Sequence, residues 1–250
     1  RHSLVGSGVL DAMIKMQEVT KISILSRRPV AMAEAANDPR INVVINSDFE
    51  KYDPAVLAQL KGAQGCVWAL GISQTRVGKE EYIKITKTFA VEAAKAFQDL
   101  PPSAAEPFHF VYVSGAGATT DPGRFTSLFG RVKGETELAL AALMRKPCDR
   151  LRAMSVRPAG VDGGAHAAIR PYLPTPPLAL RLMVPVLMPA IRSLAPGFHS
   201  PTEPLGRFLV ELAMGRHAEQ LRVEGNGVQR VGEFPILENS VFRRWAKLDS

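Results

Sequence analysis

The sequence has few cysteines, no long apolar run and no leader-like start. Cys66 stands in an apolar run and Cys148 follows a proline, so the two have the spacing of neither a zinc site nor a disulfide framework. The first residues do not join a charged region to an apolar one, and no apolar run reaches the roughly 20 residues that cross a bilayer. We therefore expect a protein of a reducing compartment, in the cytoplasm, without a bound metal.

Acidic and aromatic side chains are also scarce. The chain carries 24 acidic and 31 basic residues, a formal net charge of +7, and 7% of its residues are aromatic. Positive charge attracts phosphate-bearing ligands, nucleic acid or anionic membranes. The basic residues are scattered and do not alternate with aromatic ones, as binding of single-stranded nucleic acid would require. We therefore expect a small phosphate-bearing ligand and no nucleic-acid partner.

Short β-branched runs alternate with longer amphipathic segments through the first two thirds of the chain. Strands are predicted at residues 21–25, 41–45, 65–70, 108–113 and 151–156, and helices at 5–16, 53–60, 79–98 and 125–144. This alternation predicts right-handed crossovers and an α/β fold with a Rossmann-like, doubly wound parallel sheet. With 250 residues and 46% hydrophobic content, the chain is expected to form one domain over residues 1–250.

The sequence changes character after Gly160, where prolines interrupt an apolar segment. We expect residues 160–220 to form a small C-terminal substrate lobe or lid on the single domain. The alternative is that residues 178–191 cap the open end of the sheet, since Pro185 and Pro189 disfavour a long regular helix there. A further helix is predicted over 205–214 and a last strand over 221–224.

Gly6 and Gly8 resemble the end of a glycine-rich turn that enters a helix. Backbone N–H groups at such a helix start bind pyrophosphate, which makes Gly6 a candidate cofactor-binding residue. No apolar strand precedes the turn, and Ser3 stands where the middle glycine of a GxxGxxG turn is expected if Gly6 is the last. The first strand of the sheet is therefore expected to be missing from this sequence, which leaves its two neighbours unpaired on one edge.

Ser26, Arg27 and Arg28 follow the predicted strand at 21–25. Nucleotide-binding folds of this class that use NAD place an acidic residue there, about 20 residues beyond the glycine turn, to bind the ribose 2′-hydroxyl. Arginine instead presents a planar fork of donors that suits a 2′-phosphate. The sequence thus predicts NADP(H) as the cofactor, with a solvated basic loop as the alternative.

Polar or glycine residues follow the other predicted strands as well, at the edge where a parallel sheet binds its ligands. Asp48 is placed to accept from an adenine amino group, Phe49 to lie beside the base, and Gly71 to let the backbone approach the cofactor. The candidate cofactor-binding residues are Gly6, Ser26, Arg27, Arg28, Asp48, Phe49, Ala69, Leu70, Gly71, Lys133, Pro158 and Val161.

Phe129 and Lys133 are four residues apart in a predicted helix and share one face, about one turn apart. A hydroxyl at position 129 would reach a bound carbonyl, while the Lys133 ammonium would lower that hydroxyl's pKa and hold a ribose. Phe129 has no hydroxyl. Ser114, after the predicted strand at 108–113, and Lys133 are the candidate catalytic residues of a set that lacks its acid.

Two tyrosines and two histidines offer weaker alternatives. Tyr82 lies in a predicted helix and Tyr112 in a predicted strand, so both are expected to pack in the core. His109 and His166 have no partners at the spacing of a metal site or a nucleophilic triad, and structural or surface roles are expected for them.

Taken together, these motifs resemble an atypical short-chain dehydrogenase/reductase, in particular the Tat-interacting-protein-like oxidoreductases and their fungal relatives. The matching residues are Leu25-Ser26-Arg27-Arg28, Asp48-Phe49-Glu50-Lys51, Leu70-Gly71, Val113-Ser114, Val132-Lys133-Gly134-Glu135 and Val156-Arg157-Pro158. The resemblance implies an NADPH-binding Rossmann fold with a Ser, Tyr and Lys site for carbonyl substrates, or in some members a regulatory role. Ser114 and Lys133 match that set, and Phe129 departs from it at the tyrosine.

The leading expectation is an NADP(H)-dependent oxidoreductase that acts on an apolar small-molecule carbonyl or alcohol with weakened catalysis. The main rival is a regulatory or binding protein in which the cofactor sets the conformation and nothing turns over. A third expectation is attachment of the segment 178–191 to a membrane surface, since some fungal relatives are associated with mitochondria, which makes the mitochondrial outer membrane surface the alternative location. The substrate and the oligomeric state stay open.

Overall fold

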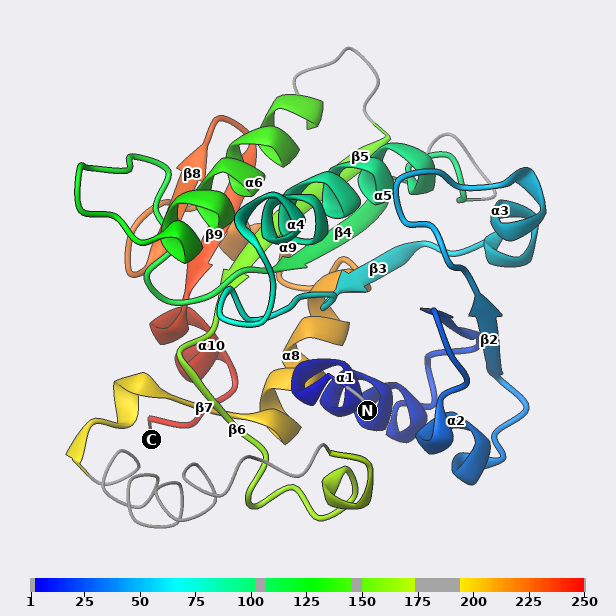
Figure 1. The fold of residues 1–250 in the computed structure, drawn as a ribbon. Coiled ribbons are helices and arrows are strands. Elements are labelled where there is room, and N and C mark those ends of the chain that lie inside the picture. The colour runs from blue at the N-terminus through cyan, green and yellow to red at the C-terminus, as the bar shows by residue number, and fades with distance from the viewer. Residues whose placement is uncertain (1–2, 102–106, 145–149, 174–193, 250) are drawn as a thin grey trace.

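The centre of the fold is a five-stranded sheet with the strand order β3-β4-β5-β9-β8 (Figure 1). The strands β3 (Gly65–Trp68), β4 (Phe108–Val113), β5 (Leu151–Arg157) and β9 (Phe234–Glu238) are parallel, and β8 (Val228–Val231) pairs antiparallel with β9. The computed structural model describes residues 3–101, 107–144, 150–173 and 194–249. The predicted α/β fold with a Rossmann-like, mainly parallel sheet is confirmed.

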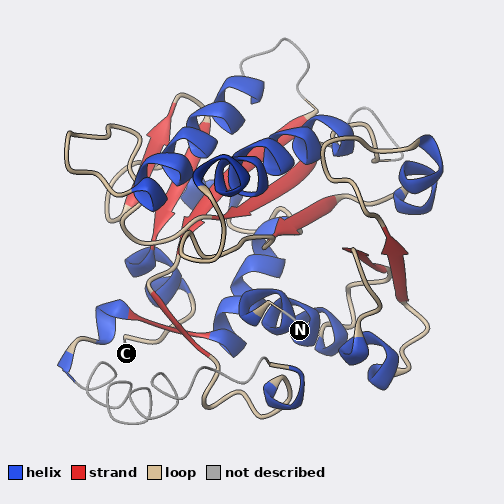
Figure 2. Ribbon diagram, in the orientation of Figure 1, coloured by secondary structure: helices blue, strands red, loops and turns tan. Residues whose placement is uncertain are grey.

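Helices cover both faces of this sheet (Figure 2). Successive strand residues point to opposite faces, so β4 supplies two different cores. Phe108, Phe110 and Tyr112 pack with α5 (Phe89–Phe97) and α6 (Leu128–Met144). Val111 and Val113 face the other layer. That layer contains α1 (Leu4–Lys15), α8 (Thr202–Ala213) and α10 (Asn239–Trp245).

A second, two-stranded sheet contains β1 (Ile22–Ser26) and β2 (Ile41–Ile45), joined by α2 (Ala31–Ala36). Ile22 is buried in a separate small core that includes Leu10 of α1. Within the described residues, β1 pairs with β2 alone and β3 with β4 alone, so no strand joins the facing edges of β1 and β3. This arrangement agrees with the expectation that the first strand is missing from the sequence.

Most predicted elements are present close to their predicted bounds. The strands at 41–45 and 108–113 match exactly. The predicted helix at 53–60 is α3 (Pro54–Leu60), capped by the Asp53 side chain. The helix predicted at 79–98 is continuous but changes pitch, as α4 (Lys79–Ile83), a π-helical turn (Lys84–Thr88) and α5. Hydrophobic periodicity does not reveal such a local change of pitch.

The strand predicted at 221–224 is wrong. Leu221 ends the short helix α9 (Ala218–Leu221), and the strands of this region come later, as β8 and β9. Three successive residues with positive φ explain the shift: Gly225 (110°), Asn226 (51°) and Gly227 (89°) form the turn that precedes β8. Two glycines and an asparagine tolerate this conformation, so the ladder begins only at Val228.

The predicted lobe at 160–220 contains several short elements. A parallel pair joins β6 (Gly160–Asp162) to β7 (His199–Pro201), and short 3₁₀ turns lie at Arg170–Tyr172 and Pro196–Phe198. The apolar segment 178–191 lies outside the described residues, so lid, cap and membrane contact all stay predictions. No described helix combines the length and apolar character that a membrane crossing needs.

Substitution of Gly206 tests the close contact between α1 and α8. A Cβ atom at Gly206 would lie 2.2 Å from the carbonyl oxygen of Gly8, so alanine forces α1 and α8 apart. Alanine favours a helix interior by about 1 kcal/mol over glycine. Overpacking costs about 1–3 kcal/mol. We expect Gly206→Ala to lower the free energy of unfolding in urea, whereas Gly123→Ala, with open space around its Cβ position, should not. Equal stability of the two variants would contradict this packing.

Candidate functional site

Ser114 lies directly after β4, at the edge of the sheet formed by the carboxyl ends of the parallel strands. Its backbone N–H donates to the carbonyl oxygen of Val156 on β5, at 2.8 Å, which extends the ladder by one residue. Its side-chain Oγ is buried and has no hydrogen-bond partner within the described part of the chain. A buried hydroxyl without a partner is unfavourable, which makes this atom a candidate for binding a ligand.

Lys133 reaches the same edge from α6. Its Nζ donates to the carbonyl oxygens of Val113 (2.8 Å) and Ser114 (3.1 Å). The ammonium also lies 5.1 Å from the ring centre of Tyr112 and 5.8 Å from that of Phe129. Such distances allow cation–π attraction. The two candidate catalytic residues named from the sequence are therefore brought together at the end of β4.

Burial lowers the pKa of Lys133 to about 8, and the nearby Glu137 carboxylate opposes this shift. Glu137, one turn later on α6, is fully buried but bound elsewhere. It accepts from Arg157 Nε (3.0 Å) and Nη2 (2.5 Å) and from the Ser155 hydroxyl (2.7 Å). Glu137 thus neutralises Arg157 of β5, and Lys133 keeps no carboxylate partner among the described residues.

The Phe129 ring packs beside Ser114 at the same edge of the sheet. A Cβ atom at Gly115 would lie 2.8 Å from Cζ of the Phe129 ring, so the tip of the ring rests on the residue after Ser114. The Phe129 backbone N–H donates to Gln74 Oε1 at 2.9 Å, which ties the start of α6 to the loop after β3. The structure therefore places a ring, without a hydroxyl, beside Ser114.

Arg27 and Arg28 are exposed directly after β1. The Ser26 hydroxyl accepts from the Arg28 N–H at 3.3 Å, which shapes the turn. Neither guanidinium has an ion pair among the described contacts, so both are available to a phosphate.

Asp48 and Phe49, in the turn that follows β2, have different environments. Asp48 is exposed, and its Oδ1 accepts from the Glu50 N–H at 2.8 Å. Phe49 is 4% exposed and packs against Trp68 and Phe89, with ring centres 6.1 and 5.7 Å apart. The interpretation that Phe49 lies beside an adenine base is therefore wrong for this conformation, because an aromatic cluster of the core takes its ring.

Gly6, at the start of α1, and the three candidate residues after β3 have different environments. Ser3 caps α1, its hydroxyl accepting from the Gly6 N–H at 3.3 Å, so this N–H already has a partner. Ala69 and Leu70 are partly buried, and Gly71 is exposed with no heavy atom within 4 Å of its Cβ position. The backbone at Gly71 is thus open to close approach.

The remaining candidates lie farther along the chain. Pro158 is buried and its carbonyl oxygen accepts from the Ala116 N–H at 2.8 Å, while Val161 is partly buried in β6. Tyr82 and Tyr112 are each 1% exposed, which confirms that they are core residues. The Tyr112 hydroxyl donates to the carbonyl oxygen of Thr86, and burial raises the pKa of this phenol.

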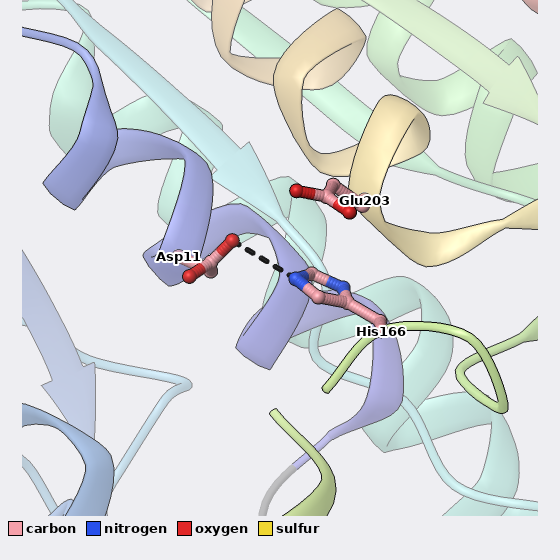
Figure 3. A group of neighbouring side chains, drawn as sticks. All are labelled: Asp11, His166 and Glu203. Carbon is pink, nitrogen blue, oxygen red and sulfur yellow. Dashed lines mark hydrogen bonds and ion pairs between the residues drawn. The ribbon is translucent and has the colours of Figure 1, made fainter. Parts of the chain in front are cut away.

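His166 has partners that the sequence did not reveal (Figure 3). It is buried, with Nε2 2.9 Å from Asp11 Oδ2 and Nδ1 2.9 Å from Thr202 Oγ1. The ligand atoms of Asp11, His166 and Glu203 lie within 4.8 Å of one another. The Lys15 ammonium already joins both carboxylates, at 2.7 Å from Asp11 and 2.8 Å from Glu203. Sequence spacing could not show these partners, since residues 155 positions apart in sequence meet here. Of the structural and surface roles expected for His166, its burial and bonds support the structural one.

The chain matches no protein-family model. It is 49% identical over 155 residues to botcinic acid biosynthesis cluster B protein 16 of Botryotinia fuckeliana, a match that covers 62% of this chain and 96% of that protein. It is 35% identical over 208 residues to leucinostatins biosynthesis cluster protein T of Purpureocillium lilacinum, covering 76% of this chain and 74% of that protein. The chain belongs to the family of these fungal biosynthesis-cluster proteins.

Solved structures share the fold at low sequence identity. The PhqB reductase domain of Penicillium fellutanum has a TM-score of 0.61 and 12% identity, over 86% of this chain and 62% of that chain. A short-chain dehydrogenase/reductase of Saccharomyces cerevisiae has a TM-score of 0.60 and 14% identity, over 94% and 91%. The enzyme WbmF of Bordetella bronchiseptica, in complex with NAD+, has a TM-score of 0.58 and 10% identity, over 99% and 77%.

The fold of this family member is therefore that of the short-chain dehydrogenases/reductases, as the sequence motifs indicated. The sequence did not reveal Glu137 and Gln74 as parts of the site. Glu137 lies one helical turn from Lys133, a signal visible in the sequence. Its partner Arg157 is on β5, which only the tertiary structure brings beside α6.

Substitution of Glu137 tests the buried ion pair. Glu137→Gln leaves the Arg157 charge without its main partner, and breaking a buried pair in this way costs about 3–5 kcal/mol. We expect a lower free energy of unfolding in urea, together with a lower pKa of Lys133, because the Glu137 charge raises it. The matched control is Glu135→Gln on the same helix, which removes an exposed pair with Lys87 and should cost at most about 1 kcal/mol. Equal losses in the two variants would contradict the assignment.

Proposed function

We propose that this protein binds NADP(H) and catalyses slow reduction or oxidation of an apolar small-molecule carbonyl or alcohol. The main support is the convergence of Ser114 and Lys133 at the carboxyl end of β4, where the Ser114 hydroxyl is buried without a partner. The NAD+ bound to WbmF, a protein of the same fold, supports a nicotinamide nucleotide as the cofactor. The fungal relatives support a substrate from secondary-metabolite biosynthesis.

The residues of the site suit such a cofactor. The exposed guanidinium groups of Arg27 and Arg28 suit a 2′-phosphate, and Asp48 can accept from the adenine amino group. The open backbone at Gly71 permits close approach along the strand ends. The positive charge of Lys133 suits the hydroxyl oxygens of the nicotinamide ribose. The bound nucleotide supplies or accepts the hydride.

The chain's own groups then act on the carbonyl. The Ser114 hydroxyl donates to the carbonyl oxygen and orients it, while the Lys133 charge favours negative charge developing on that oxygen. Phe129 provides an apolar wall and no proton. A positioned general acid contributes about 10²–10⁴-fold in rate, so its absence at position 129 accounts for slow turnover. This deficit also supports the rival, a regulatory protein in which cofactor binding alone has an effect.

The arginine pair should determine cofactor preference. We expect the parent to bind NADPH more tightly than NADH, and the double variant Arg27→Ala, Arg28→Ala to lose this preference. Hydrogen bonds to charged groups contribute about 1.5–3 kcal/mol each. The measurement is calorimetric titration with both cofactors. A control that removes two exposed charges from α8 and the end of α9, Arg207→Ala with Arg222→Ala, should keep the preference. Equal affinity of the parent for NADPH and NADH would refute the assignment.

Restoring a phenol at position 129 should raise turnover. In Phe129→Tyr the hydroxyl is added at Cζ, the atom that rests on Gly115 beside Ser114, and Lys133 one turn later lowers the phenol's pKa. We expect at least a tenfold increase in NADPH oxidation with apolar ketones and aldehydes. Thermal unfolding of the variant shows whether the oxygen is accommodated. A folded, NADPH-binding tyrosine variant that is no faster than the parent would mean that position 129 lacks access to the reacting oxygen.

A further inference from the structure

The site contains a proton donor other than the missing phenol. Lys133 Nζ lies at hydrogen-bond distance from the carbonyl oxygen of Ser114, the residue whose hydroxyl is proposed to bind the substrate oxygen. Two of its three N–H groups donate to the carbonyl oxygens of Val113 and Ser114. Among the described residues none accepts from the third. The ammonium is thus held at the strand end with one proton available.

We propose that Lys133 itself is the general acid and base of this protein, in place of the tyrosine that Phe129 replaces. This inference rests on the proposed function and names the group that moves the proton in it. In the reduction, hydride adds to the carbonyl carbon and the carbonyl π pair moves to the oxygen. That oxygen takes a proton from Lys133 Nζ, which becomes a neutral amine and regains a proton from water. In the oxidation the amine takes the proton from the alcohol.

The surroundings of Lys133 allow it to release this proton. Its carbonyl partners bind an ammonium without stabilising it as a carboxylate would. Glu137, the acidic group that faces it from the same helix, is bound to Arg157 and Ser155. Tyr112, on the strand beneath, has its hydroxyl bonded to Thr86 and is deeply buried, so it does not compete as the acid.

The protonation range of Lys133 matches this role. Burial lowers its pKa to about 8, whereas an ordinary lysine keeps its proton until well above pH 10. A general acid works best with a pKa near the operating pH. The ammonium form carries the proton, so the reduction should slow as the pH rises through about 8, and the oxidation should accelerate over the same range.

A comparison of Lys133→Arg with Lys133→Met separates proton transfer from charge. Arginine keeps the positive charge that the cofactor ribose and the developing oxyanion require, but it does not lose its proton in this pH range. We expect Lys133→Arg to bind NADPH within about threefold of the parent by calorimetry and to reduce apolar carbonyls 10²-fold or more slowly, as slowly as Lys133→Met. Lys79→Arg, at the exposed start of α4, should match the parent in both measurements.

A second readout needs neither cofactor nor turnover. In protein labelled with ¹³C at lysine Cε, the parent should show one NMR resonance that titrates near pH 8 and is absent from Lys133→Arg. Lys133→Arg that keeps the parent's rate and pH profile, or a Lys133 resonance that titrates above pH 10, would overturn the inference. NADPH that binds but is oxidised by no carbonyl compound would overturn it as well. Failure of the parent to bind either NADPH or NADH would instead refute the proposed function.

Discussion

The buried ion pair between Glu137 and Arg157 is the interaction on which the site depends. Glu137 is fully buried on α6 and Arg157 is 5% exposed at the end of β5, where it also binds Glu238 of β9. Two buried charges cost desolvation energy, so such a pair contributes more to position than to stability. It fixes α6 against two strands. Because Arg157 binds the carboxylate, Lys133 donates to carbonyl oxygens, and burial lowers its pKa.

The arrangement around Lys133 does not depend on a hydroxyl at position 129. Lys133 is held by the backbone of β4, and its position does not depend on a phenol. The Phe129 ring keeps its packing on Gly115 and its contact with the ammonium. The Lys133 charge and the Ser114 hydroxyl therefore keep their places at the end of β4 without a hydroxyl at position 129.

The chain after β5 is joined to the first helix by polar contacts. His166 bonds to Asp11 of α1 and to Thr202 of α8, and Lys15 joins Asp11 to Glu203. These bonds cross the same pair of helices as the contact between Gly8 and Gly206. Close glycine packing and a buried histidine together fix α8 on α1, within the helix layer that covers one face of the main sheet.

The sequence by itself determined the fold class and the identity of the chemical groups. Strand and helix periods are local, so β2 and β4 could be predicted to the residue. The positions of Arg27 and Ser114 followed from the strand ends, and that of Lys133 from its helical spacing to Phe129. The tertiary structure decided which of these groups meet. The Phe49 ring packs in the core, and tertiary contacts bring His166 to its partners. A turn of residues with positive φ makes the last strands begin later than predicted. The partner choice of Glu137 depends on β5 lying beside α6, and no local pattern encodes that contact. Burial of the Lys133 ammonium, which lowers its pKa, is likewise a product of the tertiary structure.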